Sequence, residues 1–422
     1  MTTATVAPSP VAHETSYRWV VLSGIWLIYF SFGLQINGLA PLVGPVSAAL
    51  GLSYSAMGTV LSAWPLFYVF ASIPCGTLVD RLGTRRSLLI AAAIMAVSAI
   101  TRGLAVDFWS LFFAVALFGI GGPLLSITTP KAIAKWFSGR ERGLAMGIYF
   151  TGPALGGIAA LATSNTVLMP LTGGRWRLVL AIYAAFMVAG GLYWLALSSR
   201  AAFRRADTGD EAGGRGTIRH QVAVYANLLR VPAVVLILAM SVGIFYFYDA
   251  TTNWLPEILI AHGIAAGPAG LLASTPVAVG VVASLIVSRL ATPERRSTVL
   301  LMLFLCMGLG AVFLMSPNPV LLGAAFVAHG IARGALMTVA LMTLMDTRGV
   351  ASHQIGAAGG LFFTAAEIGG VFGPLSFGVL FEVTGTFAAP LLVLAVVSVV
   401  LVLLLAAHRH VVRRETATAA IS

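Results

Sequence analysis

Residues 76–86 read GTLVDRLGTRR, and a related stretch, SLIVSRLATPERR, occupies residues 284–296. Only 9% of the 422 residues are charged, yet four charges fall within the eleven residues of the first stretch. The two stretches align as VDRLGTRRS (79–87) and VSRLATPERRS (287–297). A charged pattern that returns in so apolar a chain indicates an internal repeat. The chain is therefore expected to fold as two related halves.

The composition predicts a membrane protein. Hydrophobic residues make up 59% of the chain and the mean hydropathy is +0.96. A soluble protein carries about 25% charged residues, far more than this chain does. Apolar runs of ~20 residues, the length that crosses ~30 Å of hydrocarbon, recur along the sequence. Such runs must be helical, because lipid offers no hydrogen bonds to the backbone.

We therefore expect an all-α membrane protein with twelve transmembrane helices in two six-helix halves. The N-terminal half is predicted at 1–199, a cytosolic linker at 200–230, the C-terminal half at 231–408 and a tail at 409–422. The predicted spans are 18–42, 55–79, 86–106, 109–135, 141–169, 177–199, 232–260, 267–289, 297–315, 319–345, 354–382 and 386–407.

The basic residues predict the orientation. With a cytosolic N-terminus, 21 of the 25 Lys and Arg residues fall on the cytosolic side, three fall outside (Arg102, Arg175 and Arg177), and one, Arg333, falls within a span. This asymmetry follows the positive-inside rule and predicts that both termini lie on the cytosolic side of the membrane. We expect that membrane to be a bacterial inner membrane. The asymmetry also excludes nucleic acid as a partner, because the net charge of +11 arises from topological anchors.

Further correspondences support the repeat. Gly152-Pro153 in the fifth span matches Gly373-Pro374 in the eleventh, and both charged stretches lie between the second and third spans of their halves. GTLVDRLGTRR resembles the signature loop of the major facilitator superfamily. The resemblance implies that two halves rock about a central substrate site in alternating access.

The same resemblance assigns gating roles to the first charged stretch. In that superfamily the loop latches the cytosolic helix ends and favours the outward-open state. The matching residues are Gly76, Asp80, Arg81, Gly83, Arg85 and Arg86. In the second copy Ser288 replaces the acid, so a weaker latch is expected there. The alternative is that the arginines only set topology.

Subfamily features point in two directions. GPALGG (152–157) resembles the GPxxGG motif of proton-coupled antiporters, but Gly147 lies five residues upstream of Gly152 instead of four. The arginine that such exporters carry in the fourth helix is missing from LFFAVALFG (111–119). The chain more closely resembles uptake carriers for small anions, of the cyanate and nitroimidazole type.

Two ionisable residues lie near the middle of predicted spans, where a charge costs roughly 2.5–3.5 kcal/mol on insertion scales. Arg333 stays charged, so it needs a counter-ion or an anionic substrate. His329 lies one turn before it and is a further substrate-binding candidate. Glu367 can become neutral when buried and is the first proton-coupling candidate. The alternative is that Glu367 is the counter-ion of Arg333.

Asp249 is the second proton-coupling candidate. Tyr246 and Asn253 share its helix face and are candidate substrate ligands, and the alternative for Asp249 is an outer-end acid in water. Gln35 and Asn37 lie among glycines in the first span and suit uncharged hydrogen bonding to a substrate. Weaker substrate-binding candidates are Tyr149 and Asn165, for which simple packing is the alternative.

No nucleotide-binding, metal-binding or other enzymatic motif is present in the sequence. We therefore expect a monomeric secondary transporter without cofactors, whose partners are a small, anionic substrate molecule, protons and the lipid bilayer. The first hypothesis is proton-coupled uptake of a small organic anion. The second is proton-driven export of a drug or organic cation, with Asp249 and Glu367 binding the cation. A receptor or channel is the third.

Overall fold

The computed structural model describes residues 13–200, 203, 224–351 and 354–421. Eleven helices in this part of the chain are long and apolar enough to cross a membrane. The elements are α1 (His13–Asn37), η1 (Ala40–Leu42), α2 (Val43–Leu50), α3 (Tyr54–Leu104), α4 (Phe108–Trp136), α5 (Gly139–Thr163), η2 (Ser164–Leu168), α6 (Met169–Leu171), α7 (Trp176–Ser198), α10 (Pro232–Ala261), α11 (Ala266–Leu290), α12 (Arg296–Phe313), α13 (Pro319–Met345), α14 (Ile355–Thr384) and α15 (Ala388–Ile421).

Helix α3 contains two of the predicted spans. Its 51 residues would extend for ~75 Å at 1.5 Å per residue, more than twice the bilayer core. The helix breaks at Gly83, whose φ of 73° and ψ of 174° lie in a region that residues with a side chain rarely adopt. The eleven helices therefore make twelve crossings, and the predicted all-helical, twelve-span fold is confirmed.

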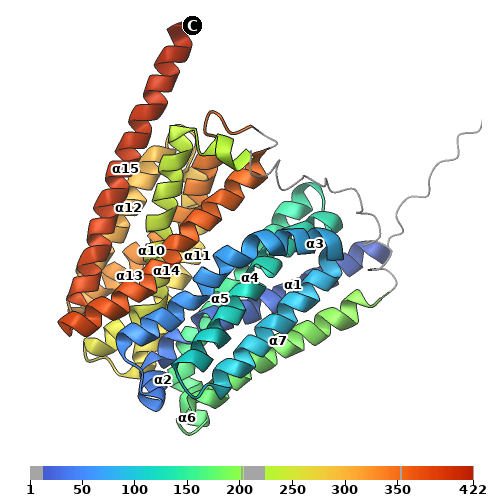
Figure 1. Ribbon diagram of the computed structural model, residues 1–422, viewed down its shortest axis with the longest axis vertical. Helices are drawn as coiled ribbons and strands as arrows, with labels where there is room; N and C mark the ends of the chain where they lie inside the picture. Colours follow the sequence, from blue (N-terminus) through green and yellow to red (C-terminus); the bar gives the residue numbers. More distant parts are fainter. Residues whose placement is uncertain (1–12, 201–202, 204–223, 352–353, 422) are drawn as a thin grey trace, which may run out of the picture.

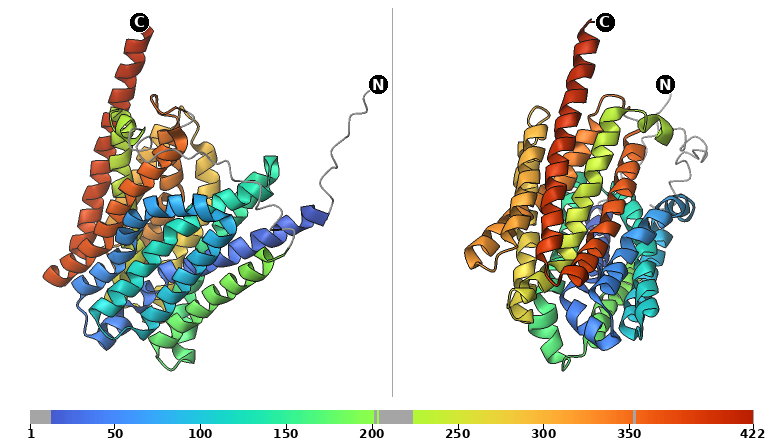
Figure 2. Two further views of the ribbon diagram at one scale, coloured as in Figure 1. Left: turned by 45° about the vertical axis from the view of Figure 1, so that its right-hand side comes forward. Right: turned by 60° about the vertical axis from the view of Figure 1, so that its left-hand side comes forward.

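The helices form two groups that lie side by side (Figure 1). The N-terminal group comprises α1–α7 and the C-terminal group comprises α10–α15. The start of α1 and the end of α15 lie toward one end of the bundle, called the termini end here, and α2 lies at the opposite end, called the far end (Figures 1 and 2). The two groups diverge toward the termini end. Most of the predicted linker, residues 204–223, lies outside the described residues, so its boundaries stay a prediction.

The two GP elements hold equivalent places in their groups. A β-carbon on Gly152 of α5 would lie 3.1 Å from the carbonyl oxygen of Trp26 on α1. A β-carbon on Gly373 of α14 would lie 2.6 Å from the carbonyl oxygen of Tyr246 on α10. In each group, glycine thus lets the fifth span approach the first at backbone distance, as expected for small residues in membrane helix packing. These contacts account for the glycine of both GP elements by packing alone.

Two carboxylates of the C-terminal group close the far end against helix N-termini of the N-terminal group. Glu257 of α10 accepts a hydrogen bond of 3.0 Å from the backbone N–H of Gly44 in the first turn of α2, and one of 3.4 Å from the Tyr54 hydroxyl. Glu382 of α14 accepts one of 2.8 Å from the backbone N–H of Ser55 in the first turn of α3. These N–H groups lack partners within their helices, and the helix dipole favours a negative charge there.

Other contacts extend the closure at the far end. Ser62 of α3 donates a 2.6 Å hydrogen bond to the carbonyl oxygen of Val371 on α14. The Asn165 side chain, near the far end of the fifth span, donates to the carbonyl oxygens of Pro41 and Ala266, one in each group. Asn165 thus bridges the groups through backbone acceptors.

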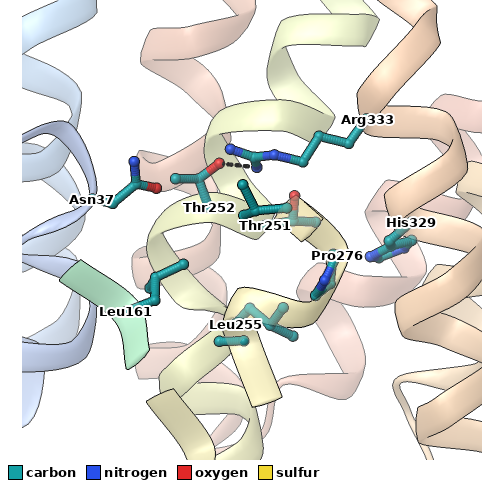
Figure 3. A pocket seen from close by; sticks show the side chains of 10 residues that line it. Asn37, Leu161, Thr251, Thr252, Leu255, Pro276, His329 and Arg333 are labelled. Carbon is teal, nitrogen blue, oxygen red and sulfur yellow. Dashed lines mark hydrogen bonds between the residues drawn. The ribbon is translucent and has the colours of Figure 1, made fainter. Parts of the chain in front are cut away.

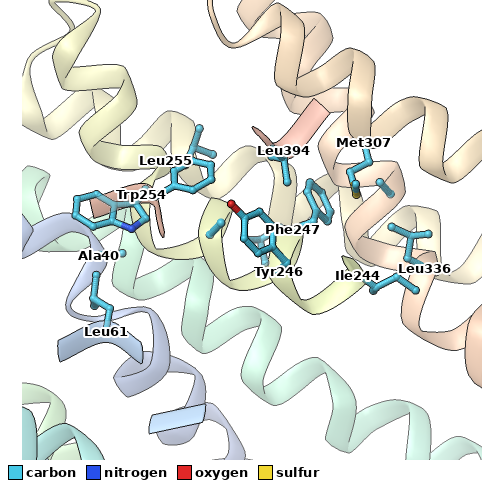
Figure 4. Close-up of a cluster of buried hydrophobic side chains, with 14 of the residues drawn as sticks. Ala40, Leu61, Ile244, Tyr246, Phe247, Trp254, Leu255, Met307, Leu336 and Leu394 are labelled. Carbon is cyan, nitrogen blue, oxygen red and sulfur yellow. The ribbon is translucent and has the colours of Figure 1, made fainter. Parts of the chain in front are cut away.

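The largest apolar cluster surrounds α10 at the contact between the groups (Figure 4). Trp254 is fully buried and its indole N–H donates a 2.9 Å hydrogen bond to the carbonyl oxygen of Pro374 on α14. Tyr246 and Phe247 continue this cluster along α10. The packing fixes α10, and with it the polar residues that α10 carries toward the centre of the molecule.

Candidate functional site

A cavity of about 210 Å³ lies between the two groups of helices, lined by residues of α1, α3, α4, α10, α13 and α14. Eight of its 17 lining residues are aromatic, and both groups contribute them. Arg333 and Glu367 are the only Arg, Lys, His, Asp or Glu residues in the lining, among the residues that the structure describes. The lining comprises Tyr29, Phe32, Ile36, Trp64, Tyr68, Gly122, Leu125, Ser126, Ile244, Phe245, Phe247, Tyr248, Arg333, Leu336, Met337, Phe363 and Glu367.

The Arg333 side chain of α13 extends toward Thr252, on the side where Asn37 of the N-terminal group lies (Figure 3). Its guanidinium carbon lies 3.9 Å from the centre of the Tyr248 ring, and one terminal nitrogen donates a hydrogen bond to the Thr252 hydroxyl. Within the described part of the chain, no carboxylate oxygen lies within 4.0 Å of this guanidinium. The direct partners of Arg333 are therefore neutral, and the guanidinium at the cavity wall forms no ion pair within the described part of the chain.

A second, much smaller pocket of about 10 Å³ is also lined by Arg333 (Figure 3). Asn37 and His329 line it together with Thr251 and Thr252. Asn37 Nδ2 donates to the carbonyl oxygen of Gly33, whereas Asn37 Oδ1 and His329 Nε2 are buried with no hydrogen-bond partner among the described residues. Arg333 lines both spaces, whereas the predicted ligands Asn37 and His329 line only the smaller one.

The two candidate proton-coupling acids lie close together behind the cavity wall. Both Asp249 of α10 and Glu367 of α14 are buried, each with 3% of its surface exposed. A β-carbon on Gly370 would lie 3.0 Å from Asp249 Oδ2 and 3.0 Å from Glu367 Oε2, so these oxygens are at most twice that distance apart. Glu367 Oε2 has no hydrogen-bond partner among the described residues. Asp249 and Glu367 thus form a pair of neighbouring carboxyl groups, of which Glu367 lines the cavity.

Four of the other predicted substrate ligands lie outside the cavity lining. Tyr149 is buried and packs edge-on against Tyr29 at 5.1 Å between ring centres. The Tyr246 hydroxyl lies 2.7 Å from that of Ser376. Asn253 Nδ2 donates to the carbonyl oxygen of Asp249, within its own helix. These side chains bond or pack within the helix bundle, and their roles in binding stay predictions.

Gln35, the fourth, is buried beside Arg102. The carbonyl oxygen of Gln35 accepts a 3.1 Å hydrogen bond from Arg102, whose guanidinium lies over the ring of Phe118 at 4.8 Å. Neither side-chain polar atom of Gln35 has a partner among the described residues. Arg102 is only 3% exposed, although the charge count places it among the residues outside the membrane.

Comparison with known proteins now gives the family. The family model described as Major Facilitator Superfamily matches residues 25–347. The chain belongs to the major facilitator superfamily. It is therefore a multi-pass membrane transport protein and not an enzyme, as the sequence predicts.

Two bacterial relatives of this superfamily member align along most of their length. The chain is 24% identical to the 2-nitroimidazole transporter of Escherichia coli (strain K12), over 91% of this chain and 94% of the relative. It is 26% identical to the probable sulfoacetate transporter SauU of Cupriavidus necator, over 89% and 90% respectively. The crystal structure of nucleoside transporter NupG shares the fold, with a TM-score of 0.74 at 16% identity, over 93% of this chain and 98% of that chain.

The superfamily's signature loop interacts within the N-terminal group. Asp80 forms an ion pair with Lys131 of α4. The Arg85 side chain donates to the Ser198 hydroxyl of α7, and the Arg85 carbonyl oxygen accepts from Trp194. Arg81 and Arg86 are exposed, and a β-carbon on Gly76 would contact only Ile127, at 3.9 Å. The loop lies at the termini end, where the groups diverge, and its gating role stays a prediction.

The second copy of the loop pairs differently. Arg296 of α12 forms an ion pair with Asp346, the residue that follows α13, and donates to the carbonyl oxygen of Met342. The acid missing at Ser288 is thus replaced by one from the end of another helix. This pair ties together two spans of the C-terminal group.

Sequence reasoning missed the aromatic walls of the cavity. Trp64, Tyr68 and Phe363 were not distinguished from the other aromatic residues of the chain, because an aromatic side chain in a membrane helix can face lipid, a neighbouring helix or a cavity. Tyr248 and Thr252, the two partners of Arg333, were missed as well. Their spacing of four residues on the helix of Asp249 is the one signal that could have indicated them.

Proposed function

We propose that this superfamily member takes up a small organic anion together with protons, by alternating access. The observation that carries the proposal is the position of Arg333, a permanent cation that lines the central cavity and whose direct contacts, Thr252 and Tyr248, are neutral. Arg333 is partly buried, and no carboxylate forms an ion pair with it, so an anionic substrate in the cavity would supply a direct counter-charge. The planar fork of the guanidinium suits a carboxylate or a similar acidic group.

The printed names of the relatives support this proposal. One is a 2-nitroimidazole transporter and another a probable sulfoacetate transporter, and sulfoacetate is an organic anion. Both align with this chain over about nine-tenths of its length, so the central cavity lies within the aligned part of the fold.

The carboxyl pair Asp249–Glu367 provides a site for the coupled proton. Two carboxylates this close repel each other when both are charged, so a proton held by one of them would relieve that repulsion. An anion beside Arg333 would add negative charge next to Glu367 and strengthen proton binding there. By reciprocity the proton would strengthen anion binding, which is the thermodynamic basis of symport.

The arrangement of the helices suits one state of an alternating-access cycle. The far end is closed by contacts between the groups, and the groups diverge at the termini end. With the termini on the cytosolic side of the plasma membrane, as the basic residues predict, this state faces inward. The predicted latch made by the signature loop is then released, in keeping with its contacts inside one group.

Export of an organic cation is the second candidate, favoured by the same carboxyl pair. If Asp249 and Glu367 were both charged, they would attract a cation to the cavity, and Arg333 would serve as an internal charge balance. The GPxxGG motif gives this candidate less support, because packing already accounts for Gly152.

A transport assay in proteoliposomes tests the proposal. Vesicles with an alkaline interior should accumulate at least one of two radiolabelled anions, benzoate or sulfoacetate, when the outside is made acidic. Arg333→Gln should abolish this uptake, because the anion loses its counter-charge. Arg295→Gln is the matched control: Arg295 is exposed at the start of α12, and its replacement should leave uptake within about twofold of wild type.

The opposite pattern would favour export. Ethidium efflux driven by an inward proton gradient, with no anion uptake and with Arg333→Gln merely less stable, would overturn the uptake proposal. A proton gradient that leaves anion uptake unchanged would refute the coupling alone.

A further inference from the structure

The walls of the central cavity are mostly aromatic and offer few hydrogen bonds. Rings of Tyr29, Phe32 and Trp64 from the N-terminal group face the cavity together with rings of Tyr248 and Phe363 from the C-terminal group. Aromatic side chains interact well with flat rings placed face-on or edge-on, at about 0.5–1.5 kcal/mol per pair beyond simple burial. A substrate that makes use of this lining has a flat body.

The polar atoms of the lining are largely committed to protein partners. The hydroxyls of Tyr68 and Ser126 lie 2.8 Å apart, and the Tyr29 hydroxyl points to the carbonyl oxygen of Leu125 at 3.5 Å. A polyhydroxylated substrate would bury several hydroxyls without partners, each costing about 1–3 kcal/mol. The cavity therefore disfavours sugar acids.

The charge of the lining also limits the substrate. Among the described residues, Arg333 is the one guanidinium that lines the cavity. Glu367 is the one acidic residue in the lining, and its carboxylate would repel a second negative charge on the substrate. A dianion would leave one charge unmatched in a mostly apolar space. The volume of about 210 Å³ is below the ~300–1,000 Å³ of sites for drug-sized ligands, which points to a single ring.

One further donor lies in the wall. The indole N–H of Trp64 has no hydrogen-bond acceptor among the residues that the structure describes, and Trp64 lines the cavity on the group opposite Arg333. This donor suits a single heteroatom or an electron-rich edge on the body of the substrate.

From these observations we infer that the substrate is a compact, planar monoanion with one aromatic or heteroaromatic ring. Arg333 binds its acidic group, and the rings of Trp64 and Phe363 contact its body. This inference rests on the proposed function, since it takes the cavity to be the anion-binding site, and it narrows the substrate to one chemical class.

A binding series on the purified wild-type protein tests the inference. The readout is the melting temperature, which a ligand raises by mass action, at constant ionic strength set with sodium chloride. The probes are benzoate, cyclohexanecarboxylate, gluconate and sulfoacetate, which separate ring, flatness, hydroxyl content and charge. Benzoate should bind about tenfold more tightly than cyclohexanecarboxylate, and gluconate and sulfoacetate should give no saturable shift.

Two cavity variants add a second readout. Trp64→Leu and Phe363→Leu should each reduce the preference for benzoate over cyclohexanecarboxylate about threefold or more, because flat contact area is lost. Phe113→Leu is the matched control, since Phe113 lies on α4 with 57% of its surface exposed. The wild-type series stands by itself if a cavity variant does not fold.

The outcomes separate this inference from the function on which it rests. Equal affinity for benzoate and cyclohexanecarboxylate, or preferred binding of gluconate or sulfoacetate, would overturn the planar monoanion and leave anion transport standing. Stabilisation by tetraphenylphosphonium and by none of the anions would overturn both.

Discussion

At the scale of single residues, the proposed role of Glu367 predicts how substrate binding depends on pH. Its carboxyl lines the cavity and lies near Asp249, so the proton it binds removes negative charge next to the anion. We predict that wild-type affinity for the anion is high at acidic pH and falls about tenfold per pH unit once this proton is lost. Glu367→Gln keeps the neutral form, so its affinity should be flat across the same range in a calorimetric titration. A slope unchanged from wild type would place the proton elsewhere.

Gly370 maintains the spacing of the carboxyl pair. A methyl group there would lie 3.0 Å from both Asp249 Oδ2 and Glu367 Oε2, closer than atoms in ordinary contact. Gly370→Ala should therefore displace the acids and reduce proton-driven uptake severalfold, measured in proteoliposomes. Gly356→Ala, on the same helix with no atom within 4 Å of the added methyl, should keep normal uptake. Equal activity of the two variants would contradict a role for the spacing.

The chemistry of the site is more predictable than its walls. Arg333 and Glu367 could be selected from the sequence because a charge in an apolar span must have a partner or a purpose. Trp64 could not, since aromatic residues in membrane helices are common and only the fold shows which ones face the cavity. Arg102 lies at the end of a span, where sequence suggests exposure, but the tertiary packing buries it under Gln35 and Phe118.

At the scale of helices, the break in α3 depends on one glycine. Gly83, at φ 73° and ψ 174°, joins two spans with no intervening loop. We predict that Gly83→Ala costs about 1–3 kcal/mol of stability, because a β-carbon is strained in this conformation. Gly76→Ala in the same loop should be nearly neutral, since its added methyl would have only an ordinary contact with Ile127. Melting temperatures of the two variants make the comparison, and equal values would refute it.

Helix number was predictable from the sequence, whereas helix continuity was not. The number of crossings follows from the apolar runs and the charged residues that separate them. The charges of residues 76–86, for example, separate the second span from the third. The sequence suggests a loop between spans 55–79 and 86–106, yet the helix continues through it apart from Gly83. The fifth span, expected to be regular to residue 169, ends in a π-helical turn at Ser164–Leu168. Such details depend on tertiary contacts that no local pattern encodes.

At the scale of the whole molecule, Glu257 stabilises the state that is closed at the far end. We predict that Glu257→Gln shifts the population toward far-end opening, because hydrogen bonds to a charged acceptor contribute ~1.5–3 kcal/mol and the neutral amide keeps only part of this. The measurement is the labelling rate of Val46→Cys, a buried position of α2 at the far end, by a membrane-impermeant maleimide, in a background with Cys75 and Cys306 replaced by Ser. The rate should rise severalfold in the Glu257 variant.

Glu294→Gln is the control for this experiment. Glu294 lies in the loop before α12, at the termini end, where hydrogen bonds from its own backbone and from Thr292 lower the pKa of its carboxyl. Its replacement should leave the labelling of Val46→Cys unchanged. A similar increase with both variants would show a general loosening of the fold.

The contact between Glu257 and Gly44 has a consequence for how this carrier can change during evolution. The donor is a main-chain N–H. The contribution of the N-terminal half to this contact therefore depends on its backbone conformation and not on the identity of a side chain. Residue covariation between the halves will therefore miss this contact. Chimaeras that join the C-terminal half of this chain to the N-terminal half of a distant relative should still close, as long as the turn at the start of α2 is kept.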